Sequence, residues 1–195
     1  MQLPPDIRLQ QRLQKWSNYL AASMVIIALL ALLGWQWDMV FLKDPFSSDV
    51  FMNPVSAIAF VLSGLSMWLS FKFRPGYPAF ILAVLVLLVG LLRFSGHVFD
   101  FRFQIDTLLF TDSIVTGNAA DPGRRMAPNT ALCFMLTGIC LIFFPGNNQK
   151  RNLSHYAAIL ITLLTLLSLL GYLYRVQSFY GFLSYIPMAA STAIC

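Results

Sequence analysis

The stretch that decides the fold is Met52–Leu65, MNPVSAIAFVLSGL, which recurs without a gap at Met126–Ile139 as MAPNTALCFMLTGI. Met, Pro, Ala, Phe, Leu and Gly match in register, and a third copy begins at Met188 as MAASTAIC. Internal repetition of this kind sets the architecture of a chain. Pro at the first helical position, followed by Ser or Thr and an apolar run, is typical of a helix start. We therefore predict three helices that begin alike, and we call residues 52–57, 126–131 and 188–193 the start segments.

The composition indicates an all-α integral membrane protein. Hydrophobic residues make up 58% of the 195 and charged residues 11%, whereas a soluble domain has roughly 25% charged residues. Apolar runs of about 20 residues are long enough to cross a hydrocarbon core of roughly 30 Å. The net charge is +5, but the basic residues flank apolar segments, which favours a role in membrane topology over binding to nucleic acid.

The apolar segments predict five full transmembrane helices and the start of a sixth. We expect the five over residues 16–36, 54–71, 77–94, 128–144 and 154–176. The basic residues before position 16 are expected to form a short helix at the membrane interface. The sixth helix begins at the third start segment and is too short to span. We therefore expect the chain to belong to something longer or to use the surface of a partner.

The helices that precede the start segments also end alike. Leu32–Trp37, LLGWQW, matches Leu169–Tyr174, LLGYLY, and Leu91–Phe94, LLRF, is a weaker echo. The repeating unit therefore has two crossings, which predicts three tandem repeats in parallel orientation about an axis along the membrane normal. A pseudo-threefold order follows from the count of copies, and a linear arrangement is the alternative. The single membrane domain, 1–195, divides into repeats at about 16–72, 77–145 and 154–195.

Basic residues predict the orientation of these helices. Seven of them belong to one side of the membrane, where Asp6 is the only acidic residue: Arg8, Arg12, Lys15, Lys72, Arg74, Lys150 and Arg151. Because positive residues favour the cytoplasmic side, the N-terminus is expected in the cytoplasm. The three start segments are then expected at the outer surface.

Gly123–Phe134, GRRMAPNTALCF, carries a resemblance to a known group of proteins, together with Met52-Asn53-Pro54, Ile105–Phe110 and Tyr185–Met188. In these segments the chain resembles the N-terminal membrane-embedded input regions of bacterial sensor histidine kinases and diguanylate cyclases. The resemblance implies a six-helix module of the bacterial inner membrane that feeds cytoplasmic PAS, kinase or cyclase domains. An extra Arg leaves open whether Arg124 or Arg125 takes the family position.

The polar residues of the start segments are the candidate ligand-binding residues: Asn53, Ser56, Asn129, Thr130, Ser191 and Thr192. One interpretation is that they cap helices and allow close packing. The other is that the three start segments converge and these groups line an outward pocket. Arg124 and Arg125 precede a helix start whose free amide groups attract anions, so they could bind an anionic ligand or lipid phosphate.

Other chemistry has little support in the sequence. His97 is expected to make an interfacial hydrogen bond, and a single bond to a haem or pigment is the weaker alternative. His155 is expected at the opposite side of the membrane, so the two do not form a pair of axial ligands. The sequence shows no nucleophile and base, no metal cluster and no phosphate-binding loop. We expect neither catalysis nor a bound metal, and the cofactor, if any, is unknown.

The favoured function is a sensory input module whose outer pocket is coupled to a cytoplasmic signalling domain in cis. The alternative is a non-catalytic accessory subunit of a larger respiratory or photosynthetic membrane complex. A transporter or channel ranks third because no helix centre carries a charge. Expected partners are membrane lipid, the signalling domain or other membrane subunits, with a homo-oligomer also possible and no nucleic acid.

Overall fold

The computed structural model describes residues 7–37, 39–43, 51–72, 76–99, 126–144, 148–174 and 188–195. All regular structure within these ranges is helical, as predicted. The elements are α1 (Ile7–Gln36), α2 (Val40–Lys43), α3 (Pro54–Lys72), α4 (Tyr77–Val98), α7 (Pro128–Phe143), α8 (Asn148–Tyr174) and α10 (Ala190–Ile194).

Four of the described helices are long and apolar enough to cross a membrane. They are α1 over Gln11–Gln36, α3, α4, and α8 over Arg151–Tyr174. Helix α7 is also apolar but has 16 residues, or about 24 Å at 1.5 Å per residue. That length is less than the roughly 30 Å of a hydrocarbon core, so a fifth full crossing stays a prediction.

Helix α1 is longer than expected. It runs unbroken for 30 residues from Ile7, so the separate interfacial helix predicted before residue 16 is wrong. No Gly or Pro interrupts residues 7–33, and Leu, Arg, Gln and Lys are good helix formers. Arg8, Arg12 and Lys15 therefore extend the first crossing as its basic N-terminal turns.

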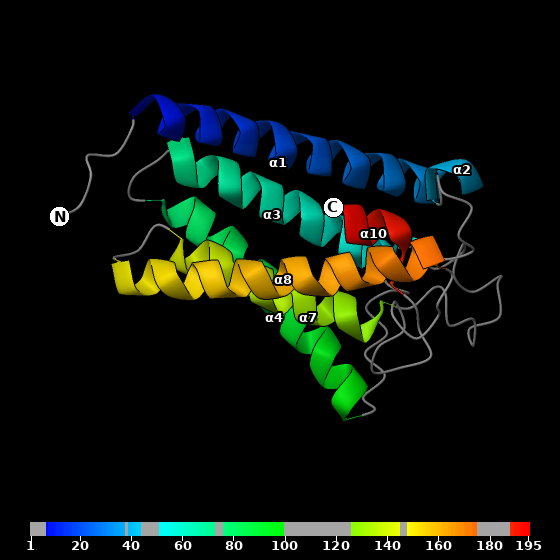
Figure 1. Ribbon diagram of the computed structural model, residues 1–195. Coiled ribbons are helices and arrows are strands. Elements are labelled where there is room, and N and C mark those ends of the chain that lie inside the picture. Colours follow the sequence, from blue (N-terminus) through cyan, green and yellow to red (C-terminus); the bar gives the residue numbers. More distant parts are fainter. Residues whose placement is uncertain are drawn as a thin grey trace.

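The three start segments lie toward one end of the bundle. Neighbouring helices along the chain pack against each other, from α1 with α3 through to α8 with α10, and α3 also contacts α7. Figure 1 shows that α3, α7 and α10 begin at the end where α1 and α8 finish. Pro54 and Pro128 are thus at the same end of the bundle, as predicted.

Three buried apolar clusters hold this end together. Each contains the methionine of one start segment and the alanine five residues after it: Met52 with Ala57, Met126 with Ala131, and Met188 with Ala193. Each cluster also includes a side chain that comes from a different start segment or the helix after it: Ala59 with Met126, Ala127 with Met188, and Cys195 with Met52. The second start segment therefore packs on α3, the third on the second, and the first on the end of α10.

Glycines allow close approach between α4 and α7. A Cβ on Gly138 would lie 2.6 Å from Leu87 Cβ and 2.7 Å from the Leu87 backbone, and one on Gly90 would lie 2.5 Å from Met135 N. Gly64 faces Val25 of α1 in the same way. Gly64, Gly90 and Gly138 therefore have a packing role, since small residues let membrane helices approach closely.

Substitution of Gly138 by Ala should destabilise the bundle, because the new Cβ would meet the Leu87 backbone, which cannot move aside. Overpacking of this kind costs about 1–3 kcal/mol, more than the roughly 1 kcal/mol that Ala gains over Gly as a helix former. The measurement is thermal unfolding in detergent micelles. Ala158→Val, on the exposed side of α8, is the control. A midpoint for Gly138→Ala equal to that of wild type would contradict the described contact.

Candidate functional site

The chain enters each start segment through non-helical, buried backbone. Ala127 and Ala189, the N-caps of α7 and α10, have φ/ψ of −65°/145° and −61°/142°. The methionines that precede the caps, Met52, Met126 and Met188, are 0, 3 and 1% exposed. A carbonyl in extended backbone has no partner in the helix ladder, and an apolar environment supplies no water. Each methionine carbonyl therefore needs a donor from elsewhere in the chain.

A ring near the end of the preceding crossing supplies that donor in all three cases. Trp35 Nε1 donates to Met52 O at 2.8 Å. His97 Nε2 lies 2.9 Å from Met126 O. The Tyr172 hydroxyl donates to Met188 O. Three chemically different rings thus make the same hydrogen bond, each between the end of one helix and the segment that begins the next.

The position of His97 corrects the sequence comparison. Leu91–Phe94 was matched to Leu32–Trp35 and Leu169–Tyr172, which would make Phe94 the equivalent ring. The hydrogen bonds instead make Gly96-His97 the equivalent of Gly34-Trp35 and Gly171-Tyr172 in the repeat. The signal in the sequence was a Gly followed by a ring that can donate a hydrogen bond. The Leu-Leu pair at positions 91–92 aligned with the other two Leu-Leu pairs and drew the comparison to Phe94 instead. The expected hydrogen bond of His97 is confirmed, with Met126 O as partner.

Further hydrogen bonds recur after each start. The amides of Ala57, Ala131 and Ala193 donate at 3.0 Å to the carbonyls of Asn53, Ala127 and Ala189. Further along the helices, the Ser63 hydroxyl donates to Ala59 O and the Thr137 hydroxyl donates to Cys133 O, both at 2.8 Å. Equivalent positions in the sequence therefore have equivalent local structure.

The six described candidate residues are all buried, between 1 and 6% exposed. Asn53 Oδ1 accepts from Val55 N at 2.9 Å and so caps α3. The predicted capping role is wrong for α7 and α10, whose N-caps are Ala127 and Ala189 and carry no side-chain cap bond. Asn129, Thr130, Ser191 and Thr192 lie inside the first turn, whereas a capping side chain must precede it.

Five of these side chains differ from every other buried polar residue that the structure describes. Six of the eleven buried polar residues make side-chain hydrogen bonds: Asn53, Ser63, Ser66, Ser70, Ser154 and Ser168. No hydrogen bond joins the side chains of the other five to a described residue: Ser56, Asn129, Thr130, Ser191 and Thr192. All five belong to the start segments.

Two of these hydroxyl groups lie on facing sides of α3 and α7. The rings of Phe60 and Phe134 meet edge to face, with centroids 4.8 Å apart. Ser56 and Thr130 precede these rings by four residues, which is one turn on the same helix face. Thr192 holds the same position in the third start segment. The hydroxyl groups of the first two start segments therefore line the contact between α3 and α7.

A cavity of about 250 Å³ lies beside the third start segment, between α1, α2 and α10. Its lining is apolar except for one residue: Ile27, Leu30, Ala31, Phe41, Leu42, Ser191 and Ile194. Ser56 and Thr130 do not line this cavity. This space suits a slender apolar group, since drug-sized ligands need roughly 300–1,000 Å³.

Two of the predicted site residues, Arg124 and Arg125, fall outside the described part of the chain. Within the described ranges, no group of three or more His, Cys, Asp or Glu is placed to hold a metal ion. No protein-family model, curated protein or solved structure matches the chain at a significant level. The start segments therefore carry the functional inference.

Replacement of Tyr172 by Phe should lower stability, because the Met188 carbonyl loses its donor while the ring stays in place. A buried carbonyl left without a partner costs about 1–3 kcal/mol. Tyr174→Phe is the matched control, because Tyr174 is 70% exposed. Thermal unfolding of both variants in micelles checks this, and equal midpoints for the two would show that the Tyr172 bond contributes nothing.

Proposed function

We propose that this chain is a membrane-embedded sensory input module of a bacterial signalling protein and is not itself a catalyst. The observation that carries the proposal is the set of three ring-to-carbonyl hydrogen bonds, which tie each start segment to the end of the neighbouring crossing. A ligand or lipid that alters the packing at this end would move α10 relative to the other helices. The resemblance to input regions of histidine kinases and diguanylate cyclases supports the same function.

Helix α10 is connected both to α8 and to the cluster around Met52, so a movement at one of these contacts can be passed to α10. The Ser168 hydroxyl contacts Met188 Sδ at 3.6 Å, next to the Tyr172 bond. Cys195, at the far end of α10, packs against the cluster around Met52. The apolar cavity touches α10 at Ser191 and Ile194. An occupant shifts an equilibrium only if it binds one arrangement better than the other, and the cavity gives an apolar occupant direct contact with α10.

The proposed architecture is three two-crossing repeats in parallel around an axis along the membrane normal. In this arrangement α7 is a crossing and α10 begins the sixth. Two observations support it: the same backbone hydrogen bond recurs at equivalent positions of the three copies, and each methionine cluster includes a residue from another copy.

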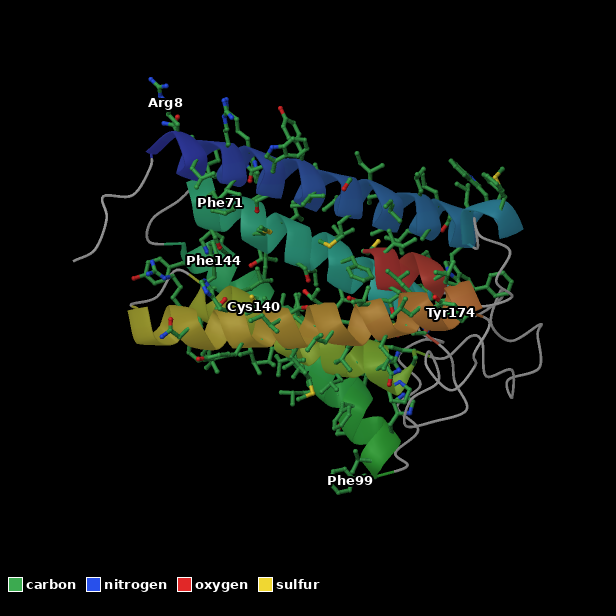
Figure 2. All side chains as sticks on the ribbon, in the orientation of Figure 1. Arg8, Phe71, Phe99, Cys140, Phe144 and Tyr174 are labelled. Atoms are coloured by element: carbon green, nitrogen blue, oxygen red, sulfur yellow. The ribbon has the colours of Figure 1, made fainter. Side chains whose placement is uncertain are left out.

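The proposed location is the bacterial inner membrane with the N-terminus in the cytoplasm. Arg8, Phe71 and Phe144 lie at one end of the bundle and Tyr174 lies at the other (Figure 2). The ring centroids of Phe71 and Phe144 are 5.6 Å apart. The other basic residues of this end are Arg12, Lys15, Lys72 and Arg151. Because positive charge favours the cytoplasmic side, the start segments would face outward.

An accessory subunit of a larger membrane complex is the second candidate. The observation that favours it is the exposure of α8, of whose span only 17% is buried. Its large exposed side chains include Leu160, Leu163 and Leu166. Stoichiometric co-purification of other membrane subunits would favour this function over a sensory one.

The orientation can be tested with single cysteines in a background without Cys133, Cys140 and Cys195. Met39→Cys, at the outer end, should react with a membrane-impermeant maleimide in intact cells, whereas Gln11→Cys should react only after permeabilisation. Met39 and Gln11 are both exposed, so a difference in labelling between them reports the side of the membrane on which each residue lies. The reverse pattern would place the N-terminus outside.

Coupling to an output domain can be tested by fusion. Cys195 is joined, through about 14 apolar residues that complete a span of about 20, to a cytoplasmic histidine kinase domain. Tyr172→Phe should change kinase output several-fold, because the bond that holds Met188 sets the packing of α10. Tyr174→Phe should not. Output that is the same in wild type and both variants would contradict a sensory role.

A further inference from the structure

We propose that the exposed face of α1 at the end of the bundle where this helix begins is a binding site for an anionic phospholipid. Arg12 and Lys15 contact the lipid headgroup, and the apolar face that follows them contacts an acyl chain. The inference goes beyond the proposed function, because it concerns the end of the bundle opposite the start segments. It applies equally to a sensory module and to an accessory subunit.

The first support is the unequal division of charge between the two ends of the bundle. At the end where α1 begins, the segments outside the apolar spans, residues 1–15, 72–76 and 144–151, contain seven basic residues and one acidic residue. The segments that connect helices at the other end, residues 38–53, 99–127 and 175–189, contain five basic and seven acidic residues. Clusters of roughly four to eight Lys and Arg beside a membrane span attract anionic lipid.

The second support is the direction in which three of these basic residues point. Arg8, Arg12 and Lys15 are spaced by four and three residues, so they lie on one side of α1, and all three are exposed. The opposite side of α1 packs on α3, where Ala21 and Val25 meet a glycine. Figure 2 shows Arg8 on the side of α1 that points away from α3. The basic side of the helix therefore faces the surrounding membrane.

The third support is the depth of these residues in the membrane. Trp16 and Trp37 are 66 and 62% exposed, and about 32 Å of helix separates them. This length matches a hydrocarbon core of roughly 30 Å, at whose two interfaces Trp is enriched. Trp16 also packs edge to face with Tyr19, with ring centroids 6.5 Å apart. Lys15 and Arg12 then lie about 2 and 6 Å beyond Trp16, within a headgroup layer roughly 5–8 Å thick.

The face of α1 between the two interfaces suits an acyl chain. Ile26, Leu30 and Leu33 are 57, 44 and 40% exposed and continue the side that Lys15 and Tyr19 begin, at helical spacing. A soluble anion would use only the basic part of this surface, whereas a phospholipid uses both parts. The continuous surface therefore favours a membrane lipid over a soluble anion.

The basic residues favour a lipid with net negative charge. The Arg12 guanidinium presents paired donors that match a phosphate group, and the Lys15 ammonium adds a point charge beside it. In a zwitterionic headgroup the lipid's own cation offsets the attraction of its phosphate to these residues. An anionic headgroup has no such cation, so its attraction to the basic residues is larger.

The chain allows variants that separate a site from net charge. Arg12→Gln with Lys15→Gln removes both headgroup contacts. Arg12→Gln with Gln14→Arg keeps the net charge but moves one positive charge to another side of α1, since Gln14 lies seven residues before Ala21, which packs on α3. Lys15→Arg keeps the charge in place. All three substituted residues are exposed, so the variants should unfold at the wild-type temperature in neutral micelles.

The experiment measures lipid binding to the purified full-length chain by native mass spectrometry in a neutral detergent. The probes are phosphatidylglycerol and phosphatidylcholine with the same acyl chains. Wild type should bind phosphatidylglycerol more tightly, and added salt should reduce this preference by screening. Each basic residue near an anionic lipid contributes about fivefold to affinity. The double glutamine variant should therefore bind phosphatidylglycerol about 30-fold more weakly, and the charge-relocated variant about fivefold more weakly. Lys15→Arg should bind it as wild type does.

Three outcomes would overturn the lipid site. Equal wild-type affinity for the two lipids would show that the headgroup charge is not recognised. Wild-type affinity in the charge-relocated variant would show that net charge alone attracts the lipid. Displacement of bound phosphatidylglycerol by inorganic phosphate would identify a site for a soluble anion. The salt dependence of the wild-type chain tests the proposal even if a variant fails to fold.

Discussion

A carbonyl group in extended backbone, buried where water is absent, is the constraint on which this bundle depends. Each start segment must bring non-helical chain among apolar helices before it can begin a new one. The carbonyls of Met52, Met126 and Met188 would then be unsatisfied, at a cost of about 1–3 kcal/mol each. Trp35, His97 and Tyr172 remove that cost, and in doing so they fix the end of one helix against the start of the next. These three bonds join α1 to the segment before α3, α4 to the segment before α7, and α8 to the segment before α10.

The start segments also bring buried polar residues together with the methionines at one end of the bundle. Along α3, α7 and α8, buried hydroxyls deeper in the bundle donate to backbone carbonyls, as Ser63, Thr137 and Ser168 do. Ser56 and Thr130 lie in the first turns of α3 and α7 and are also buried. An apolar cavity lies next to α10 at the same end of the bundle.

The sequence allowed the start segments and their common end of the bundle to be predicted, because Met, Pro and the apolar run repeat in register. It predicted a hydrogen bond of His97 but not its partner Met126 O or its equivalence to Trp35 and Tyr172, because Leu91–Phe94 matched the other helix ends more visibly than Gly96-His97 did. The capping role expected for Thr130 and Thr192 was wrong, since the cap positions hold Ala127 and Ala189. Burial depends on the facing helix, so the sequence could not show that Ser56 and Thr130 are 1 and 3% exposed. Arg124 and Arg125 lie outside the described residues, and their role stays a prediction.

The most direct test of the central claim is disulfide formation between cysteines placed at the three equivalent positions. Ser56→Cys, Thr130→Cys and Thr192→Cys would be combined in pairs, in a background without Cys133, Cys140 and Cys195, and oxidised in membranes. If the start segments converge, all three pairs should crosslink, directly or through a short bis-thiol reagent, since a disulfide requires Cβ atoms roughly 3.5–4.5 Å apart. A control pair of Ser66→Cys with Thr130→Cys should not crosslink, because Ser66 lies further along α3 than Ser56 by more than two helical turns. Crosslinking between residues 56 and 130 without any to residue 192 would contradict the account, because the third start segment would then lie apart from the other two.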